Sequence, residues 1–143
     1  MSKRWIAPWA GSATKPAIYH CLSRVVDRRF ALEDRERERF RWIMRRVEGF
    51  SGCRVLAYCC MSNHFHLLLE VTPMPDGGLS DEELLRRLGE LYSDAEVGEV
   101  AKELENARKW VEGAEDAAAA ELAAARVAAI HARFTYRMHD LGH

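Results

Sequence analysis

Hydrophobic and polar positions follow two different periods along the first half of the chain. Residues 17–26 are rich in strand-forming side chains and predict a first strand. Residues 32–50 instead repeat apolar side chains at helical spacing, with Asp34 as the N-cap and Gly49 as the C-terminal stop. The apolar positions of this predicted helix are Phe40, Ile43, Met44 and Val47.

Residues 53–61 and 65–71 predict two further strands, joined by a tight turn at Ser62 and Asn63. A strand, a helix and an adjacent strand pair indicate an α+β fold, a largely antiparallel sheet with helix on one face. Side chains alternate along a strand, so one face of the last strand carries His64, His66, Leu68 and Glu70, and the other carries Phe65, Leu67, Leu69 and Val71. The apolar face is the expected seat of the helix.

From residue 79 the pattern becomes helical and acidic. Ser80, followed three residues later by Glu83, predicts a capping box at a helix start. Residues 114–134 are alanine-rich and predict a helix flanked by solvent. We expect one domain over residues 1–143, in which residues 79–134 form a helical insertion that serves as a lid, a spacer or a dimer interface.

Charge is distributed unevenly over the 143 residues. Residues 1–71 carry 13 Lys and Arg against 7 Asp and Glu, whereas residues 72–143 carry 8 against 15. A basic half suits a nucleic-acid surface, because phosphate neutralisation supplies most of the sequence-independent affinity. The alternative is a solvated ion-pair face, and both interpretations apply to the helix arginines Arg41, Arg45 and Arg46.

Neither a signal peptide nor an apolar stretch long enough to cross a bilayer is evident in the sequence, which predicts a cytoplasmic protein without a membrane partner. The four cysteines form no C-x-x-C pair and are expected to be reduced, buried thiols. A zinc site made by Cys59, Cys60, His64 and His66 is disfavoured, because adjacent residues on a strand point to opposite faces.

Two imidazoles at positions i and i+2 of one strand can hold a divalent metal ion when a third ligand comes from a neighbouring element. The alternative for His64 and His66 is a pair of polar residues at the start of a buried strand. Glu70 shares their face, but it lies on the order of 13 Å beyond His66 and is not expected to be a ligand.

The segments "YHCLSRVVDRRF" and "RVLAYCCMSNHFHLLLEV", separated by an acidic and arginine-rich helix, resemble the REP-associated tyrosine transposases, small single-tyrosine members of the HUH endonuclease superfamily. The resemblance covers about residues 15–73. In that family two histidines flank a hydrophobic residue after an asparagine on a central strand, and Asn63, His64, Phe65 and His66 match this motif.

The resemblance implies metal-assisted cleavage and rejoining of single-stranded or hairpin DNA through a phosphotyrosine intermediate. It implies that His64 and His66 hold Mg²⁺ or Mn²⁺, with Zn²⁺ less expected. It also implies that Arg24, Arg28 and Arg29 contact DNA phosphates.

The nucleophile is where the sequence departs from the family pattern. Asp140 and Leu141 resemble the segment that precedes the family's tyrosine, so the resemblance places the nucleophile beyond residue 143, as expected of a truncated form or a degenerate copy. Tyr136 is the candidate substitute within the chain. Two alternatives stay open, a non-catalytic DNA-binding remnant and a metal-dependent phosphoesterase that uses water.

Overall fold

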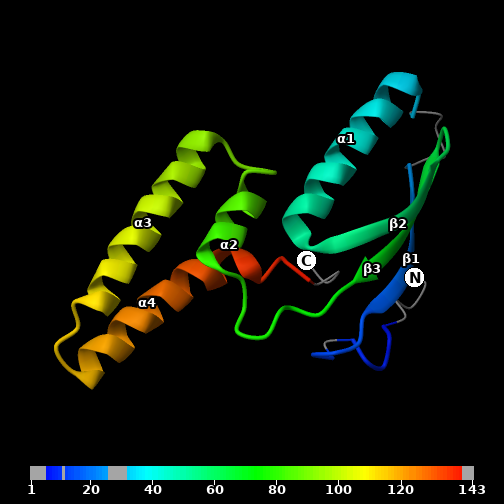
Figure 1. The fold of residues 1–143 in the computed structure, drawn as a ribbon. Coiled ribbons are helices and arrows are strands. Elements are labelled where there is room, and N and C mark those ends of the chain that lie inside the picture. The colour runs from blue at the N-terminus through cyan, green and yellow to red at the C-terminus, as the bar shows by residue number, and fades with distance from the viewer. Residues whose placement is uncertain (1–5, 11, 26–31, 140–143) are drawn as a thin grey trace.

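The computed structural model describes residues 6–10, 12–25 and 32–139. Within these ranges the elements are β1 (Ala17–Arg24), α1 (Asp34–Ser51), β2 (Cys53–Cys60), β3 (His64–Val71), α2 (Asp81–Leu88), α3 (Asp94–Glu112) and α4 (Ala117–Thr135). The three strands and α1 form one part of the molecule, and α2, α3 and α4 gather beside the end of α1 (Figure 1). The predicted α+β class is confirmed.

The sheet has the strand order β1-β3-β2, with both pairs antiparallel. Strand β3 is therefore central, and its first residue, His64, lies opposite Arg24 of β1. The predicted turn between the last two strands is present, because the backbone N–H of Met61 donates to the His64 carbonyl at 2.8 Å across Ser62 and Asn63. A β-bulge at Leu56 interrupts the pairing of β2 with β3.

The bounds of α1 differ from the predicted ones at both ends. Glu33, and not Asp34, is the N-cap, and the helix continues through Gly49 to Ser51. Gly52 ends it, with φ of 71° and its N–H directed to the Glu48 carbonyl. A left-handed residue after the last turn is the usual helix stop, and glycine adopts it without a Cβ clash. The prediction of Gly49 as the stop was therefore wrong.

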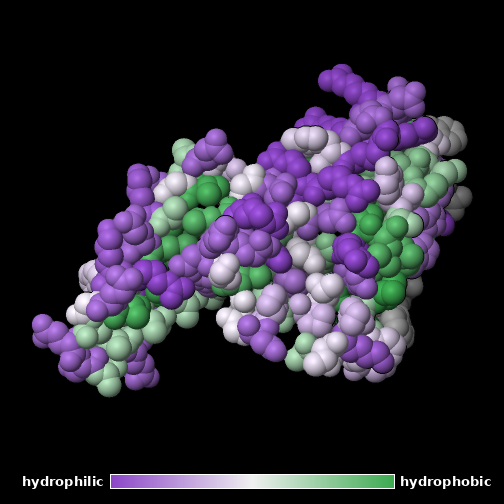
Figure 2. Space-filling view, viewed as in Figure 1, coloured by the Kyte–Doolittle hydropathy of each residue, from purple (hydrophilic) through white to green (hydrophobic). Residues whose placement is uncertain are grey.

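Helix α1 packs on one face of the sheet, as predicted. The ring centroids of Phe40 and Phe65 on β3 are 4.6 Å apart, and Met44 is buried. Ile43 and Val47 are each 44% exposed, so the predicted apolar stripe is only partly covered. Figure 2 shows hydrophilic side chains over the outer side of α1 and hydrophobic surface over the strands beside it.

The buried hydrophobic cluster of the described residues lies mainly in the helical part. Leu84, Leu88 and Leu104 are almost completely buried, and each such side chain stabilises the fold by ~1.5–3 kcal/mol. Helix α4 contributes Val127 and Ile130 to this cluster, so the prediction that it is simply flanked by solvent was wrong. Alanine side chains of α4 and α3 are also buried. Even so, no described helix is both long and apolar enough to cross a bilayer.

Capping side chains define where these helices begin. Ser80 Oγ accepts from the Glu83 N–H, so Ser80 is the N-cap of α2 as predicted. The Glu83 carboxylate, however, pairs with Arg86 and Arg87. The two reciprocal bonds of a capping box are found instead between Ser93 and Glu96 at the start of α3.

His139 connects the helical part to the sheet. Its backbone N–H donates to the Ser51 carbonyl at 2.8 Å, and its Nδ1 lies 2.8 Å from the Thr72 carbonyl oxygen. Its Nε2 lies 2.9 Å from Arg87 of α2. The segment after α4 is thereby tied to the ends of α1 and β3.

Candidate metal centre

Strand β3 separates its side chains between two different environments. Phe65 faces α1, as its contact with Phe40 shows. Because neighbouring side chains alternate, His64 and His66 lie on the opposite face, which none of the described helices covers. The predicted division of the two faces is therefore confirmed.

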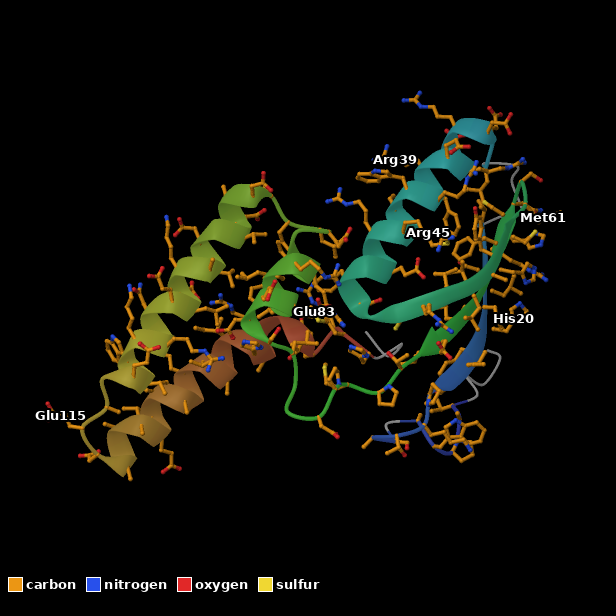
Figure 3. The ribbon with its side chains drawn as sticks, in the orientation of Figure 1. His20, Arg39, Arg45, Met61, Glu83 and Glu115 are labelled. Atoms are coloured by element: carbon orange, nitrogen blue, oxygen red, sulfur yellow. The ribbon has the colours of Figure 1, made fainter. Side chains whose placement is uncertain are left out.

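The pairing of β1 with β3 places a third histidine on this face. Leu22 lies opposite His66, and His20 lies two pairs further along on the same face, opposite Leu68. The His20 Nε2 is 2.8 Å from the His66 Nδ1. Figure 3 shows His20 on the side of the sheet away from α1. Sequence reasoning missed this histidine, because the proximity depends on strand order and register that no local pattern encodes.

The His64 ring is held by the residue before it. Asn63 Oδ1 lies 2.7 Å from His64 Nδ1, a distance typical of a strong hydrogen bond. A carboxamide oxygen can only accept, so the His64 proton is on Nδ1 and the Nε2 lone pair is available. The His64 and His66 ring centroids are 5.1 Å apart in an edge-to-face arrangement.

His66 is disposed to stay neutral. Partial burial lowers the pKa of His66 below its ordinary value, and the neighbouring His20, His64 and Arg24 lower it further. A neutral imidazole keeps a lone pair that a metal ion can accept. The donor set on this face therefore fits a divalent metal ion held by His64 and His66.

Other candidate ligands are not brought to the two histidines. Cys59 pairs with His66 and Cys60 with Phe65, so the two thiols lie on different faces, as the alternation predicts. The Glu70 carboxylate forms an ion pair with Arg54 at 2.9 Å. In the described ranges no three His, Cys, Asp or Glu side chains converge as metal ligands.

The thiols are less buried than the sequence indicated. None of the four forms a disulfide bond, and Cys53 alone among them is buried. Cys59 is exposed on the histidine face, where the absence of a covering helix leaves it open to solvent. The prediction of uniformly buried thiols was therefore wrong.

Of the predicted DNA contacts, Arg24 lies on the histidine face directly opposite His64, and it is exposed. Arg28 and Arg29 lie outside the described residues. The helix arginines make local contacts instead, since Arg41 pairs with Glu38 and Arg45 with Glu48. These pairs favour the ion-pair interpretation of that helix face.

Tyr136 follows the last turn of α4 and is 55% exposed. It is three residues before His139, which is bound to Thr72 just after the end of β3. Thr72 is six residues beyond His66 along extended chain, about 20 Å at ~3.3 Å per residue. Within a single chain the structure does not bring Tyr136 to the two histidines. Asp140 and Leu141 lie outside the described residues.

Comparison with known proteins gives one result. Residues 13–76 match the family described as "Transposase IS200 like". The match spans β1, α1, β2 and β3, less than half of the chain, and stops before α2. No curated protein and no solved structure matches the chain.

Proposed function

We propose that the chain binds single-stranded or hairpin DNA and assists cleavage of its phosphodiester backbone, because residues 13–76 match the family described as "Transposase IS200 like". The observation that carries the proposal is the pair of imidazoles on the uncovered sheet face, His64 with its Nδ1 held by Asn63 and His66 with a lowered pKa. The family match supports transposition and DNA binding as the biological context.

His64 and His66 are the residues that would hold Mg²⁺ or Mn²⁺. A divalent ion there supplies charge neutralisation at a scissile phosphate. Arg24 is exposed and lies opposite His64, which supports our proposal that it contacts a phosphate oxygen. Arg28 and Arg29 follow within five residues along the chain and complete the proposed DNA contacts.

For cleavage through a phosphotyrosine intermediate, we propose Tyr136 as the nucleophile. A phenol is a weak nucleophile near neutral pH, since its ordinary pKa is about 10, and it needs activation. The separation of Tyr136 from the histidines favours a second candidate, hydrolysis with water as the nucleophile. A third candidate function, DNA binding without cleavage, needs neither a tyrosine nor a water nucleophile.

An end-labelled DNA hairpin distinguishes these reactions. The full chain is incubated with the hairpin and Mn²⁺, and the products are separated on denaturing protein and nucleic-acid gels. A covalent adduct that Tyr136→Phe abolishes supports the transposase reaction, with Tyr58→Phe as the matched control. Cleavage without an adduct supports hydrolysis, and binding alone supports the non-catalytic alternative.

The metal ligands are tested in the same assay. The double substitution of His64 and His66 by alanine should abolish cleavage while hairpin binding persists. Cleavage that survives the double substitution contradicts the proposed site, and failure of the wild-type chain to bind any hairpin contradicts the proposed function.

A further inference from the structure

We infer that His20 is a positioning residue that fixes the tautomer of His66, so that the Nε2 of His66 faces the metal ion. This inference rests on the proposed metal function of His64 and His66. It assigns a role to His20 of β1, a residue that is not part of the two-histidine motif on β3.

The geometry of the two rings identifies the contact as a hydrogen bond in the ring plane. The centroids of His20 and His66 are 5.0 Å apart and the ring planes differ by 10°. The two nitrogens are only 2.8 Å apart, so they lie between the centroids and the rings meet edge to edge. The lone pair of an imidazole nitrogen lies in the ring plane, and this arrangement directs it at the partner's N–H.

The two nitrogens point at each other along one line, which is not the geometry of two ligands of one metal ion. Ligands of one ion direct their lone pairs at a shared point, at about 109° to each other in a tetrahedral site and about 90° in an octahedral one. Here both nitrogens lie between the ring centroids and are 2.8 Å apart, which is within the ordinary range of hydrogen bonds. His20 is therefore a hydrogen-bond partner of His66 and not a third ligand beside it.

The direction of this bond decides whether His66 can bind metal. If His66 donates from Nδ1, its Nε2 keeps the lone pair and can coordinate. If His20 donates instead, the proton of neutral His66 is on Nε2 and coordination there is blocked. Metal-ligating histidines generally donate their other ring N–H to an acceptor, which here is the Nε2 of His20.

The same arrangement occurs at the other histidine. Asn63 Oδ1 accepts from the Nδ1 of His64, as His20 accepts from that of His66, so both rings present Nε2. Both acceptors are neutral when they do this. They orient the two ligands without adding negative charge where a DNA phosphate has to approach.

Burial does not explain the contact, because His20 is exposed on the sheet surface. Its replacement is therefore compatible with folding. His20→Val keeps a strand-forming side chain but removes the acceptor, and His20→Gln restores an acceptor oxygen. Leu22→Val, on the same strand and face, is the matched control.

The first measurement reads the His66 tautomer without metal. Long-range ¹H–¹⁵N spectra of the full chain should show His66 protonated on Nδ1 in the wild type and in His20→Gln. In His20→Val this preference should be lost, while His139 keeps its own tautomer and thereby reports an intact fold. A wild-type His66 protonated on Nε2, or a tautomer that His20→Val leaves unchanged, overturns the inference.

The second measurement is Mn²⁺ affinity by calorimetry. We expect His20→Val to weaken binding by about 10- to 100-fold, with His20→Gln closer to the wild type and Leu22→Val unchanged. Equal affinity of His20→Val and the wild type overturns the positioning role. If the wild-type chain binds no Mn²⁺, the proposed metal function fails, and the tautomer spectra still decide whether His20 orients His66.

Discussion

His64 Nδ1 and Asn63 Oδ1 are 2.7 Å apart, and the two residues adjoin at the point where the β2–β3 turn becomes strand β3. The Asn63 carbonyl meanwhile accepts from the Val25 N–H at 2.9 Å. The backbone of Asn63 thus anchors the turn, while its side chain serves the imidazole. A substitution at Asn63 can remove the second role and keep the first.

We therefore predict that Asn63→Ala weakens Mn²⁺ binding by about 10- to 100-fold, because the His64 ring loses the acceptor that fixes its tautomer. Asn63→Asp, which keeps an oxygen acceptor, should bind Mn²⁺ at least as well as the wild type. Ser62→Ala in the same turn is the control. Calorimetric titration of the four chains provides the comparison, and an unchanged affinity of Asn63→Ala would show that the contact does not serve metal binding.

Asp81 holds the three C-terminal helices together. It is the first residue of α2 and accepts two hydrogen bonds from Arg108 of α3, each 2.8 Å, and one contact from His131 of α4 at 2.7 Å. We expect Asp81→Asn to lower the free energy of unfolding by ~1–3 kcal/mol, because the amide offers Arg108 and His131 one neutral acceptor oxygen in place of two charged ones. Urea unfolding measures this, with the exposed Asp76→Asn as control. Equal losses for both variants would contradict the role of Asp81.

The Asp81 carboxylate also makes the stability of the fold depend on pH. Hydrogen bonds from Arg108 lower the pKa of Asp81 from 3.8 to about 2, with partial burial opposing and His131 assisting. The folded chain therefore binds this proton less readily than the unfolded chain. The contribution of Asp81 is complete above its ordinary pKa and is lost as pH falls toward about 2.

His139 should produce a separate loss of stability at milder pH. Burial lowers the pKa of His139 below 6.5 and the Arg87 guanidinium lowers it further, against the hydrogen bond to Thr72. Arg87 can only donate, so Nε2 of His139 accepts, and a proton there would face a cation. Glu83, which bonds to Arg87, is the other charged group in this chain of contacts.

The lowered pKa of His139 determines the direction in which stability changes with pH. The unfolded chain takes up this proton at higher pH than the folded chain, so the contribution of His139 is present above about pH 6.5 and decreases as pH falls below it. Thermal unfolding between pH 7.5 and 5.5 should show a decrease that is smaller in His139→Gln. A decrease of the same size in both chains would contradict this assignment.

Two glycines should respond to alanine in opposite directions. Gly52 has φ of 71°, and an added Cβ would meet the side chains of Arg87 and His139. Gly98 lies within α3, and an added Cβ there would meet nothing within 4 Å. Gly52→Ala should lower the free energy of unfolding by at least ~1–2 kcal/mol, whereas Gly98→Ala should raise it by ~0.5–1 kcal/mol. Denaturant unfolding tests both, and a neutral Gly52→Ala would contradict the assigned strain.

Local patterns were sufficient for the strands and the turn around the histidines. The alternation from His64 to Val71 determines which side chains share a face, and the polar Ser62 and Asn63 mark the turn between two apolar runs. These features depend on neighbours within a few residues. For that reason the predicted faces of β3 agree with the structure.

Features that depend on distant residues could not be derived in this way. Gly49 and Gly52 are both suitable helix stops by sequence, and the helix continues past the first of them. The alanine-rich α4 predicts a helix whatever it packs against, so its buried Val127 and Ile130 were not foreseen. His20 approaches His66 only because β1 pairs with β3, and this pairing joins residues that are far apart in the sequence.

The central claim is that a divalent metal ion binds His64 and His66 on the uncovered sheet face, and paramagnetic broadening by Mn²⁺ tests it most directly. The structure provides internal controls in the same spectrum, because His131 is bound to Asp81 and His139 to Thr72 in the helical part and its junction. We predict that small additions of Mn²⁺ broaden the imidazole signals of His64 and His66, with neighbouring His20, before those of His131 and His139. Signals that all broaden together, or broadening that begins at His131 or His139, would contradict the metal site.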